Sequence, residues 1–296
     1  MINNITEVPH EIKNLINLEY LDLSYNKLKE LPNGIGHLIN LTQLDIKDNK
    51  VTALPKEIGN LINLTHLNIH HNELKVLPKE IVNLTNLTHL DLNNNKLTEL
   101  PIEIGNLINM TNLIIHHNEL KELPKELGNL VNLTNMDLEY NKLMELLSEI
   151  GNLINLINLN VRYNELMKLP KEIGNLINLE KLYLQSNKLQ RLPKEIEKLK
   201  KLEQLAVGRN KLKELPKEIG NFKNLEYLNI SENEELTTLP KELENLTKLD
   251  TLEMDGPLSI HYYKVGYWCE YLNESSGIMR NTLGYIYKGL PKRTGC

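Results

Sequence analysis

Residues 41–63 have the sequence LTQLDIKDNKVTALPKEIGNLIN, which is one period of a pattern that continues through most of the chain. Asparagine recurs every 23 residues, at the position that Asn49 takes in this stretch. The ten asparagines of this series are Asn26, Asn49, Asn72, Asn95, Asn118, Asn141, Asn164, Asn187, Asn210 and Asn233. A fixed period of this length is typical of repeat architectures, in which every period forms one structural unit.

Each part of the period L-x-x-L-x-L-x-x-N-x-L-x-x-L-P-x-E-I-G-N-L-x-N predicts a local structure. Leu44 and Ile46 alternate with outward residues, which indicates a short strand with one buried face. The amide of Asn49 can both donate and accept, so stacked copies can satisfy backbone groups where the chain turns. Pro55 ends the extended segment. The spacing of Ile58 and Leu61 suits a short helical or 3₁₀ turn on the opposite side.

A single period of this kind cannot fold alone. Burying its large aliphatic side chains does not offset the conformational entropy that is lost when 23 residues become ordered. Stacking against neighbouring periods is therefore required. The sequence predicts a solenoid whose parallel strands lie along one side.

The motif L-x-x-L-x-L-x-x-N-x-L, repeated ten times in register, resembles the leucine-rich repeat family over residues 1–256. The 23-residue length with LPKEIGNL is similar to the intracellular Ras-group subclass, and similar repeats occur in plant, spirochaete and large DNA virus proteins. The resemblance implies an α/β solenoid shaped as a horseshoe, with parallel β-strands on the concave face and short helical or 3₁₀ segments on the convex face. It also implies protein binding, a role in signalling or host interaction, and small GTPases among the partners.

Two periods depart from the pattern. The sequence also begins part-way through a period. Leu147 stands where the other periods have proline, and one extra residue precedes Leu236, where we expect a local bulge. Ile5 and Val8 are in register although no strand sequence precedes them. Either a longer ancestor was shortened, or residues 1–10 cover the first part of the core.

Charge and hydropathy restrict the function classes. The formal net charge is −5, and it divides into −8 for residues 1–257 and +3 for residues 258–296. This acidic solenoid argues against nucleic-acid binding. No apolar run approaches the roughly 20 residues of a membrane span, and the first residues do not resemble a secretion signal. Both cysteines, Cys269 and Cys296, lie near the C-terminus and form no disulfide framework. We expect a cytoplasmic protein.

Residues 257–296 differ in composition from the repeats. They contain six of the twelve tyrosines and the single tryptophan. An aromatic segment that follows a solenoid is most simply a cap over the open end of the core. A separate docking segment and degenerate read-through are the alternatives. As a docking segment, this tail would make the chain an adaptor that recruits an enzyme such as a ubiquitin ligase.

Signatures of catalysis are missing from the sequence. There is no phosphate-binding glycine loop, no G-x-S-x-G and no H-E-x-x-H. Pairs such as Lys56-Glu57 are better explained as solvated surface charge. We therefore predict a non-enzymatic protein without a cofactor.

The outward residues of the strands and of the turns that follow them predict a protein-binding surface. They occupy the third, fifth, seventh and eighth positions of the motif, and equivalent positions form columns because neighbouring strands lie about 4.8 Å apart. The candidate contact residues are Ile114, Tyr140, Arg162, Tyr163, Tyr183 and Arg209. Tyrosine and arginine are enriched in interface hot spots, although drift of a solvated surface explains the pattern equally well. Acidic residues in the N-terminal half favour a partly basic partner.

Six of the nine histidines also face outward: His66, His70, His71, His89, His116 and His117. His66 and His89 are the candidates for a shared metal ion because they are neighbours in one column. His70 and His116 are two strands, about 10 Å, apart, which does not suit tetrahedral zinc. A solvated polar face is the preferred explanation, and a pH-sensitive contact surface is a lesser one.

Overall fold

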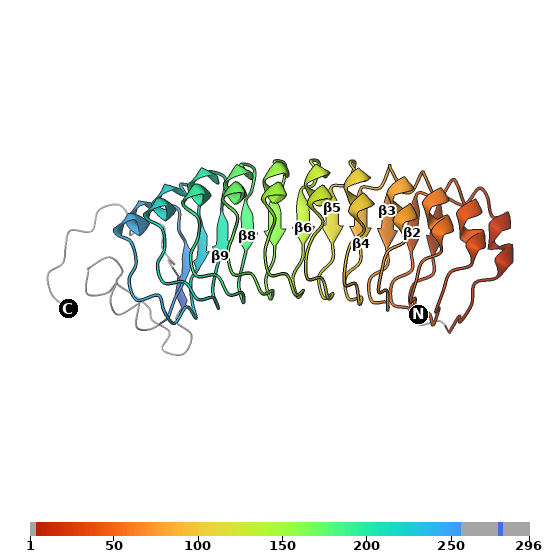
Figure 1. The fold of residues 1–296 in the computed structure, drawn as a ribbon, viewed down its shortest axis with the longest axis horizontal. Coiled ribbons are helices and arrows are strands. Elements are labelled where there is room, and N and C mark those ends of the chain that lie inside the picture. Colours follow the sequence, from red (N-terminus) through yellow and green to blue (C-terminus); the bar gives the residue numbers. More distant parts are fainter. Residues whose placement is uncertain (1–3, 256–277, 281–296) are drawn as a thin grey trace.

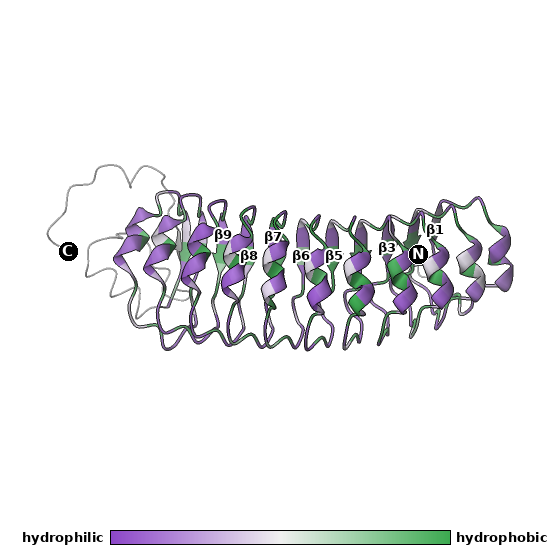
Figure 2. Cartoon of the chain, turned by 45° about the horizontal axis from the view of Figure 1, so that its top comes forward, coloured by the Kyte–Doolittle hydropathy of each residue, from purple (hydrophilic) through white to green (hydrophobic). Residues whose placement is uncertain are grey.

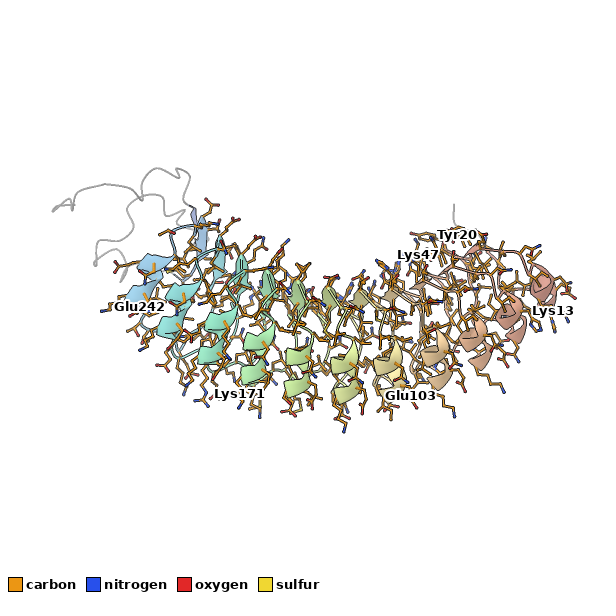
Figure 3. The ribbon with its side chains drawn as sticks, turned by 90° about the horizontal axis from the view of Figure 1, so that it is seen from above. Lys13, Tyr20, Lys47, Glu103, Lys171 and Glu242 are labelled. Atoms are coloured by element: carbon orange, nitrogen blue, oxygen red, sulfur yellow. The ribbon has the colours of Figure 1, made fainter. Side chains whose placement is uncertain are left out.

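A computed structural model describes residues 4–255 and 278–280. These residues form one elongated, curved stack of repeats, with strands along one side and short helices along the other (Figure 1). The strands line the inner side of the arc and the helices its outer side (Figure 3). The predicted leucine-rich repeat solenoid is thereby confirmed.

All strands belong to a single sheet whose order follows the sequence. The parallel strands of residues 4–255 are β1 (Tyr20–Asp22), β2 (Gln43–Asp45), β3 (His66–Asn68), β4 (His89–Asp91), β5 (Asn112–Ile114), β6 (Asn135–Asp137), β7 (Asn158–Asn160), β8 (Lys181–Tyr183), β9 (Gln204–Ala206), β10 (Tyr227–Asn229) and β11 (Thr251–Glu253). In the pairs from β1–β2 to β9–β10, each strand residue pairs with the residue 23 positions later, as Tyr20 does with Gln43. A last strand, β12 (Ile278–Arg280), pairs antiparallel with β11.

The convex side is built from five-residue 3₁₀ helices, as the spacing predicts. They are η1 (His10–Asn14), η2 (Asn33–His37), η3 (Lys56–Asn60), η4 (Lys79–Asn83), η5 (Ile102–Asn106), η6 (Lys125–Asn129), η7 (Ser148–Asn152), η8 (Lys171–Asn175), η9 (Lys194–Lys198), η10 (Lys217–Asn221) and η11 (Lys241–Asn245). Proline precedes ten of these eleven helices; before η3, for example, Pro55 has φ −67° and ψ 147°. Figure 2 shows hydrophilic and hydrophobic residues alternating along these helices, so that one side of each can face the core.

Aliphatic side chains fill the space between the sheet and the 3₁₀ helices. In the period of residues 41–63, Leu44, Ile46, Ile58 and Leu61 are each at most 1% exposed. Equivalent residues continue this core without interruption from Val8 to Met254. Every repeat thus buries its apolar face against the next one.

The asparagine series connects consecutive repeats, as predicted. Asn141 donates to the carbonyl oxygens of Leu138, at 3.1 Å, and of Ile115 in the preceding repeat, at 3.0 Å. The side-chain oxygen (Oδ1) of Asn141 accepts a hydrogen bond from the backbone N–H of Leu120 at 3.0 Å. Because Asn141 is 8% exposed, these bonds replace water at a buried turn.

The departures from the pattern are absorbed locally. Leu147 precedes η7 with φ −73° and ψ 157°, close to the angles of the prolines at equivalent positions. The extra residue before Leu236 is taken up by a turn at Glu234 and Glu235, and the Leu236 N–H donates to the carbonyl oxygen of Asn233. The sheet continues, but the extra residue forms a turn after β10 instead of the expected bulge.

At the N-terminal end, the backbone N–H of Lys27 donates to the carbonyl oxygen of Ile5, and Val8 is 5% exposed. Residues 5–18 thus extend the core in register. No helix in residues 4–255 or 278–280 has the length and apolar character needed to cross a membrane.

Candidate protein-binding face

The three-residue strands determine which side chains reach the concave surface. In β5, Leu113 is fully buried, while Asn112 and Ile114 on either side of it are half-buried and face outward. In Figure 3, Tyr20 and Lys47 lie on the concave side, while Glu103 and Lys171 lie on the convex side. The columns predicted from the motif are therefore present.

Aspartates at the fifth position of the motif have a structural role that the sequence analysis missed. Asp22, Asp91 and Asp137 each accept the backbone N–H of the residue two positions later, at 2.8–3.0 Å. Asp45 does the same and also binds the Lys47 ammonium group at 3.1 Å. These side chains stabilise the turn after each strand, as Asx turns do. The acidic character of the N-terminal half is thus partly a consequence of the fold. It is therefore weaker support for a basic partner.

The eighth position of every motif lies in the left-handed backbone region. All ten residues there have φ between 51° and 56°, and none is glycine. Asn94 and Asp48 tolerate this region well, whereas Tyr140 and Tyr163, both with φ 51°, are strained there. Because all ten repeats share this geometry, the left-handed backbone is a property of the fold, which Tyr140 and Tyr163 accept despite their bulk.

Three rings at consecutive eighth positions stack on one another. His117 and Tyr140 have ring centroids 4.3 Å apart, and Tyr140 and Tyr163 have centroids 4.1 Å apart with planes within 6° of parallel. We call His117, Tyr140 and Tyr163 the aromatic ladder. Partial desolvation, and then the hydrogen bond with the neighbouring Tyr163, raise the pKa of Tyr140. His117 was not predicted as a contact residue, although the column of eighth positions places it directly beside Tyr140.

Two arginines flank the aromatic ladder. Arg162 lies over the ring of Tyr183, 5.3 Å from its centroid, and donates to the Glu139 carboxylate at 2.8 Å. Arg209 donates to the Glu232 carboxylate at 2.8 Å, and this contact raises the pKa of Arg209. Both positive charges are thus paired with carboxylates, and both arginines lie toward the Tyr163 end of the aromatic ladder.

The structure brings together five of the six candidate contact residues. Tyr140, Arg162, Tyr163 and Tyr183 lie on consecutive repeats, and Arg209 lies one repeat beyond Tyr183. Ile114 lies apart on β5, where its register partners are Asp91 and Asp137. Unlike these aspartates, Ile114 cannot accept the backbone N–H two residues later, so its side chain does not stabilise the following turn.

The two candidate metal ligands are neighbours, but their rings are parallel. His66 and His89 stack with centroids 4.3 Å apart and planes 11° from parallel. Their Nδ1 atoms contact the hydroxyls of Thr65 and Thr88. Because the lone pair of an imidazole nitrogen lies in the ring plane, stacked rings do not direct two lone pairs at one ion. Burial, and then the neighbouring His66, lower the pKa of His89.

A further apolar row was not predicted. Seven aliphatic residues that follow the 3₁₀ helices are 43–54% exposed: Ile16, Ile39, Ile62, Ile108, Val131, Ile154 and Ile177. Their spacing in multiples of 23 was visible in the sequence, but the pattern alone did not distinguish them from core positions.

Comparison with known proteins establishes the family. A family model described as a leucine-rich repeat region matches residues 2–69, 33–147 and 136–274. The chain belongs to the leucine-rich repeat family. The comparison with curated proteins gave no match.

Solved structures of other leucine-rich repeat proteins have the same fold. A leucine-rich repeat protein of Leptospira interrogans is 38% identical, with 90% of this chain and 81% of that chain covered and a TM-score of 0.63. The functional domain of InlJ from Listeria monocytogenes is 27% identical, with 83% and 50% covered and a TM-score of 0.72. The ectodomain of the plant receptor kinase GASSHO1/SCHENGEN3 from Arabidopsis thaliana, in complex with CASPARIAN STRIP INTEGRITY FACTOR 2, is 28% identical, with 84% and 37% covered and a TM-score of 0.63.

This leucine-rich repeat chain therefore spans half or less of the length of the last two proteins. The leucine-rich repeat fold is a scaffold for protein interactions, and its extended concave surface is suited to that role.

Proposed function

We propose that this leucine-rich repeat chain is a non-catalytic scaffold that binds a protein partner on its concave face. The aromatic ladder and the arginines beside it, over repeats centred on Asn118 to Asn210, are the contact site. The observation that supports this most strongly is the continuous stack of His117, Tyr140 and Tyr163 on adjacent repeats.

Three properties of the aromatic ladder favour a binding role. Tyr140 is 41% exposed, so a large apolar ring faces solvent on an otherwise polar surface. Tyr140 and Tyr163 occupy left-handed positions where asparagine or aspartate, as at Asn94 and Asp48, would be less strained. Stacking also fixes the rings before a partner arrives, so less side-chain entropy is lost on binding.

The charges of the site suggest how a partner is recognised. Glu139 and Glu232 already neutralise Arg162 and Arg209. We therefore propose recognition through ring contacts and hydrogen bonds, with Ile114 as an outlying apolar contact. The resemblance to the Ras-group subclass supports an intracellular signalling or host-interaction role and makes small GTPases one partner class to test.

The experiment is affinity capture from the native host with the double variant Tyr163→Ala/Arg209→Ala. Removing two hot-spot side chains is expected to weaken binding by at least about 30-fold. Tyr25→Ala is the matched control, because Tyr25 has φ 56° and occupies the same column but lies outside the site. Partners should be lost from the double variant and kept by Tyr25→Ala.

The second candidate function is an adaptor that recruits an enzyme through residues 257–296. Of this segment the structure describes only residues 278–280, as strand β12, and the rest lies outside the described residues. An adaptor would lose its partners when residues 281–296 are deleted and would keep them in Tyr163→Ala/Arg209→Ala. That pair of results would contradict binding through the concave site.

A further inference from the structure

The seven residues IHHNELK occur twice, at 69–75 and at 115–121, in different surroundings. In the preceding repeat, the residue in the same column as the second histidine is Asp48 for the first copy and Asn94 for the second copy. The two copies therefore present the same histidine pair to a carboxylate in one case and to an amide in the other.

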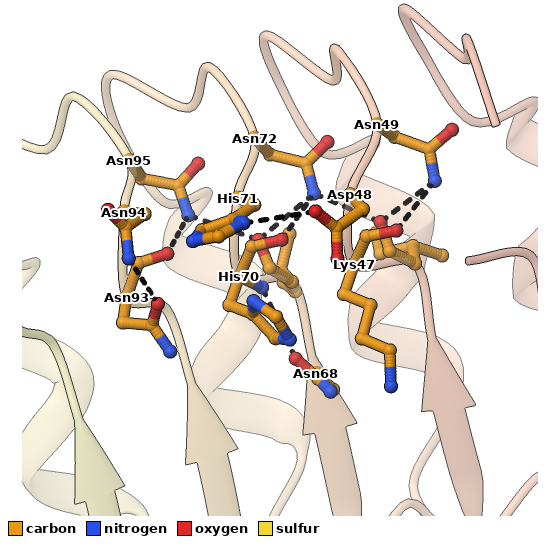
Figure 4. A network of polar contacts seen from close by, with 12 residues as sticks. Lys47, Asp48, Asn49, Asn68, His70, His71, Asn72, Asn93, Asn94 and Asn95 are labelled. Carbon is orange, nitrogen blue, oxygen red and sulfur yellow. Dashed lines mark hydrogen bonds and ion pairs between the residues drawn. The ribbon is translucent and has the colours of Figure 1, made fainter. Parts of the chain in front are cut away.

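Around the first copy, three potential metal ligands converge. The His71 Nδ1 atom lies 3.0 Å from an oxygen of the Asp48 carboxylate. One ring nitrogen of His70, one of His71 and one oxygen of Asp48 all lie within 4.8 Å of one another. Figure 4 shows the three side chains side by side on neighbouring repeats, between the asparagines of the turn. Asp48 was not predicted as a ligand, because only pairs of histidines were considered as metal ligands from the sequence.

His70 provides a second, independent observation. Its Nδ1 atom is buried, and among the described residues it has no hydrogen-bond partner. A buried polar atom without a protein partner destabilises the folded state unless a water molecule or an ion satisfies it. An ion bound through Nδ1 would satisfy this nitrogen.

We propose that Asp48, His70 and His71 bind a divalent transition-metal ion of the Zn²⁺ type. Two imidazoles and one carboxylate are ligands that such ions prefer, whereas Mg²⁺ and Ca²⁺ prefer oxygen ligands alone. Zinc bonds of about 2.0–2.2 Å place tetrahedral ligand atoms somewhat over 3 Å apart. The His71–Asp48 distance of 3.0 Å is close to this value, and the His70 nitrogen, within 4.8 Å of both ligand atoms, can reach it through a small movement of the ring.

The neighbouring charged groups are compatible with a bound cation. Lys47 shares a column with His70, but its ammonium group lies 3.1 Å from the Asp45 carboxylate and over the ring of Tyr25. This arrangement directs the positive charge toward the preceding repeat. The ion pair that the metal would replace is partly exposed, with 49% of the His71 side chain and 27% of the Asp48 side chain accessible, so little stability is lost with it.

The second IHHNELK copy lacks this ligand set and is an internal control. The Nδ1 atoms of His116 and His117 contact each other at 2.9 Å, and His117 stacks on Tyr140. The Asn94 side chain donates to the side-chain oxygen (Oδ1) of Asn93 at 2.7 Å. No carboxylate in the position of Asp48 is available here.

The test is calorimetric titration with ZnCl₂ of the chain without a histidine tag. The wild-type chain is expected to bind one Zn²⁺, and the ion is expected to raise its melting temperature. Asp48→Asn reproduces the second copy and keeps a residue that tolerates the left-handed backbone. It should weaken binding by at least the roughly 10- to 100-fold that loss of a ligand's hydrogen-bond partner causes. His71→Ala should have a similar effect.

Two controls decide which histidines are responsible. His116→Ala/His117→Ala and His66→Ala/His89→Ala should both retain one Zn²⁺ with unchanged affinity. The proposal is overturned if Asp48→Asn binds Zn²⁺ as tightly as wild type, if either control abolishes binding, or if the wild-type chain shows no binding at about 100 µM Zn²⁺. Since no partner protein takes part, failure here leaves the proposed protein-binding site untouched.

Discussion

At the scale of the residue, the asparagine series shows how one side chain can join the turns of two consecutive repeats. Asn141 donates to carbonyl oxygens of its own repeat and of the preceding one, and it accepts the Leu120 N–H. No apolar residue of similar size can make these bonds. The period of 23 is therefore set as much by this amide as by the leucines.

We predict that Asn141→Ala lowers the free energy of unfolding by about 2–4 kcal/mol, because several buried backbone groups lose their partner together. Urea denaturation followed by circular dichroism measures the change. Asn155→Ala is the matched control, since exposed Asn155 makes one bond, to the Val131 carbonyl oxygen, and its loss should lower stability by less than about 1 kcal/mol. Equal effects of the two substitutions would contradict the assigned role.

The sequence predicted which residues face outward, but not how their side chains interact. Alternation along β8 placed Tyr183 on the concave face, and the motif placed Arg162 and Tyr140 at the turns that follow β7 and β6. The left-handed backbone at Tyr140 and the aspartate-stabilised turns depend on torsion angles at the strand exit, which hydrophobic spacing does not encode. Ring stacking and the approach of Asp48 to His71 follow from those angles, so the columns were predictable and the contacts within them were not.

At the scale of the element, close packing of the 3₁₀ helices depends on glycine. A Cβ atom at Gly128 in η6 would lie 2.7 Å from the backbone oxygen of Glu149 in η7, which is shorter than a van der Waals contact. In η4, Val82 takes the equivalent position, and it borders a surface depression of about 700 Å³ beside Asn106 of η5. The helices adjust their separation to the residue present.

We predict that Gly128→Val destabilises the chain by about 1–3 kcal/mol, because η6 and η7 must separate against the rest of the stack. The reverse substitution, Val82→Gly, should change stability by no more than about 1 kcal/mol, since the space already exists there. Thermal and urea unfolding of both variants provide the comparison. A Gly128→Val chain as stable as wild type would show that the helices are not closely packed.

At the scale of the whole molecule, the fold was predictable because each repeat contacts mainly its neighbours. Ten periods in register repeat the same local prediction, and even Leu147 and the extra residue before Leu236 alter only one turn each. The ends are different, because a solenoid has two edges where a repeat has no neighbour. The periodic pattern does not predict what covers these two edges. The antiparallel pairing of β12 with β11 was therefore not predicted.

The pairing of β12 with β11 gives the C-terminal residues a specific expected role. Thr251, Leu252 and Glu253 pair with Arg280, Met279 and Ile278, so β12 covers the backbone edge of the last parallel strand. An uncovered edge of this kind is a template for pairing with another chain. Leu252 and Met254 beneath it are at most 2% exposed, so an uncovered end would also present core residues to water.

We therefore predict that deleting residues 258–296 produces a chain that self-associates, whereas deleting only residues 281–296 leaves β12 in place and the protein monomeric. Size-exclusion chromatography with light scattering distinguishes the two, and urea unfolding tests whether each chain still unfolds cooperatively. The first deletion removes the antiparallel neighbour of β11, and the second does not. A soluble, monomeric and cooperatively unfolding chain that ends at residue 257 would contradict the capping role, because β11 would then tolerate a free edge.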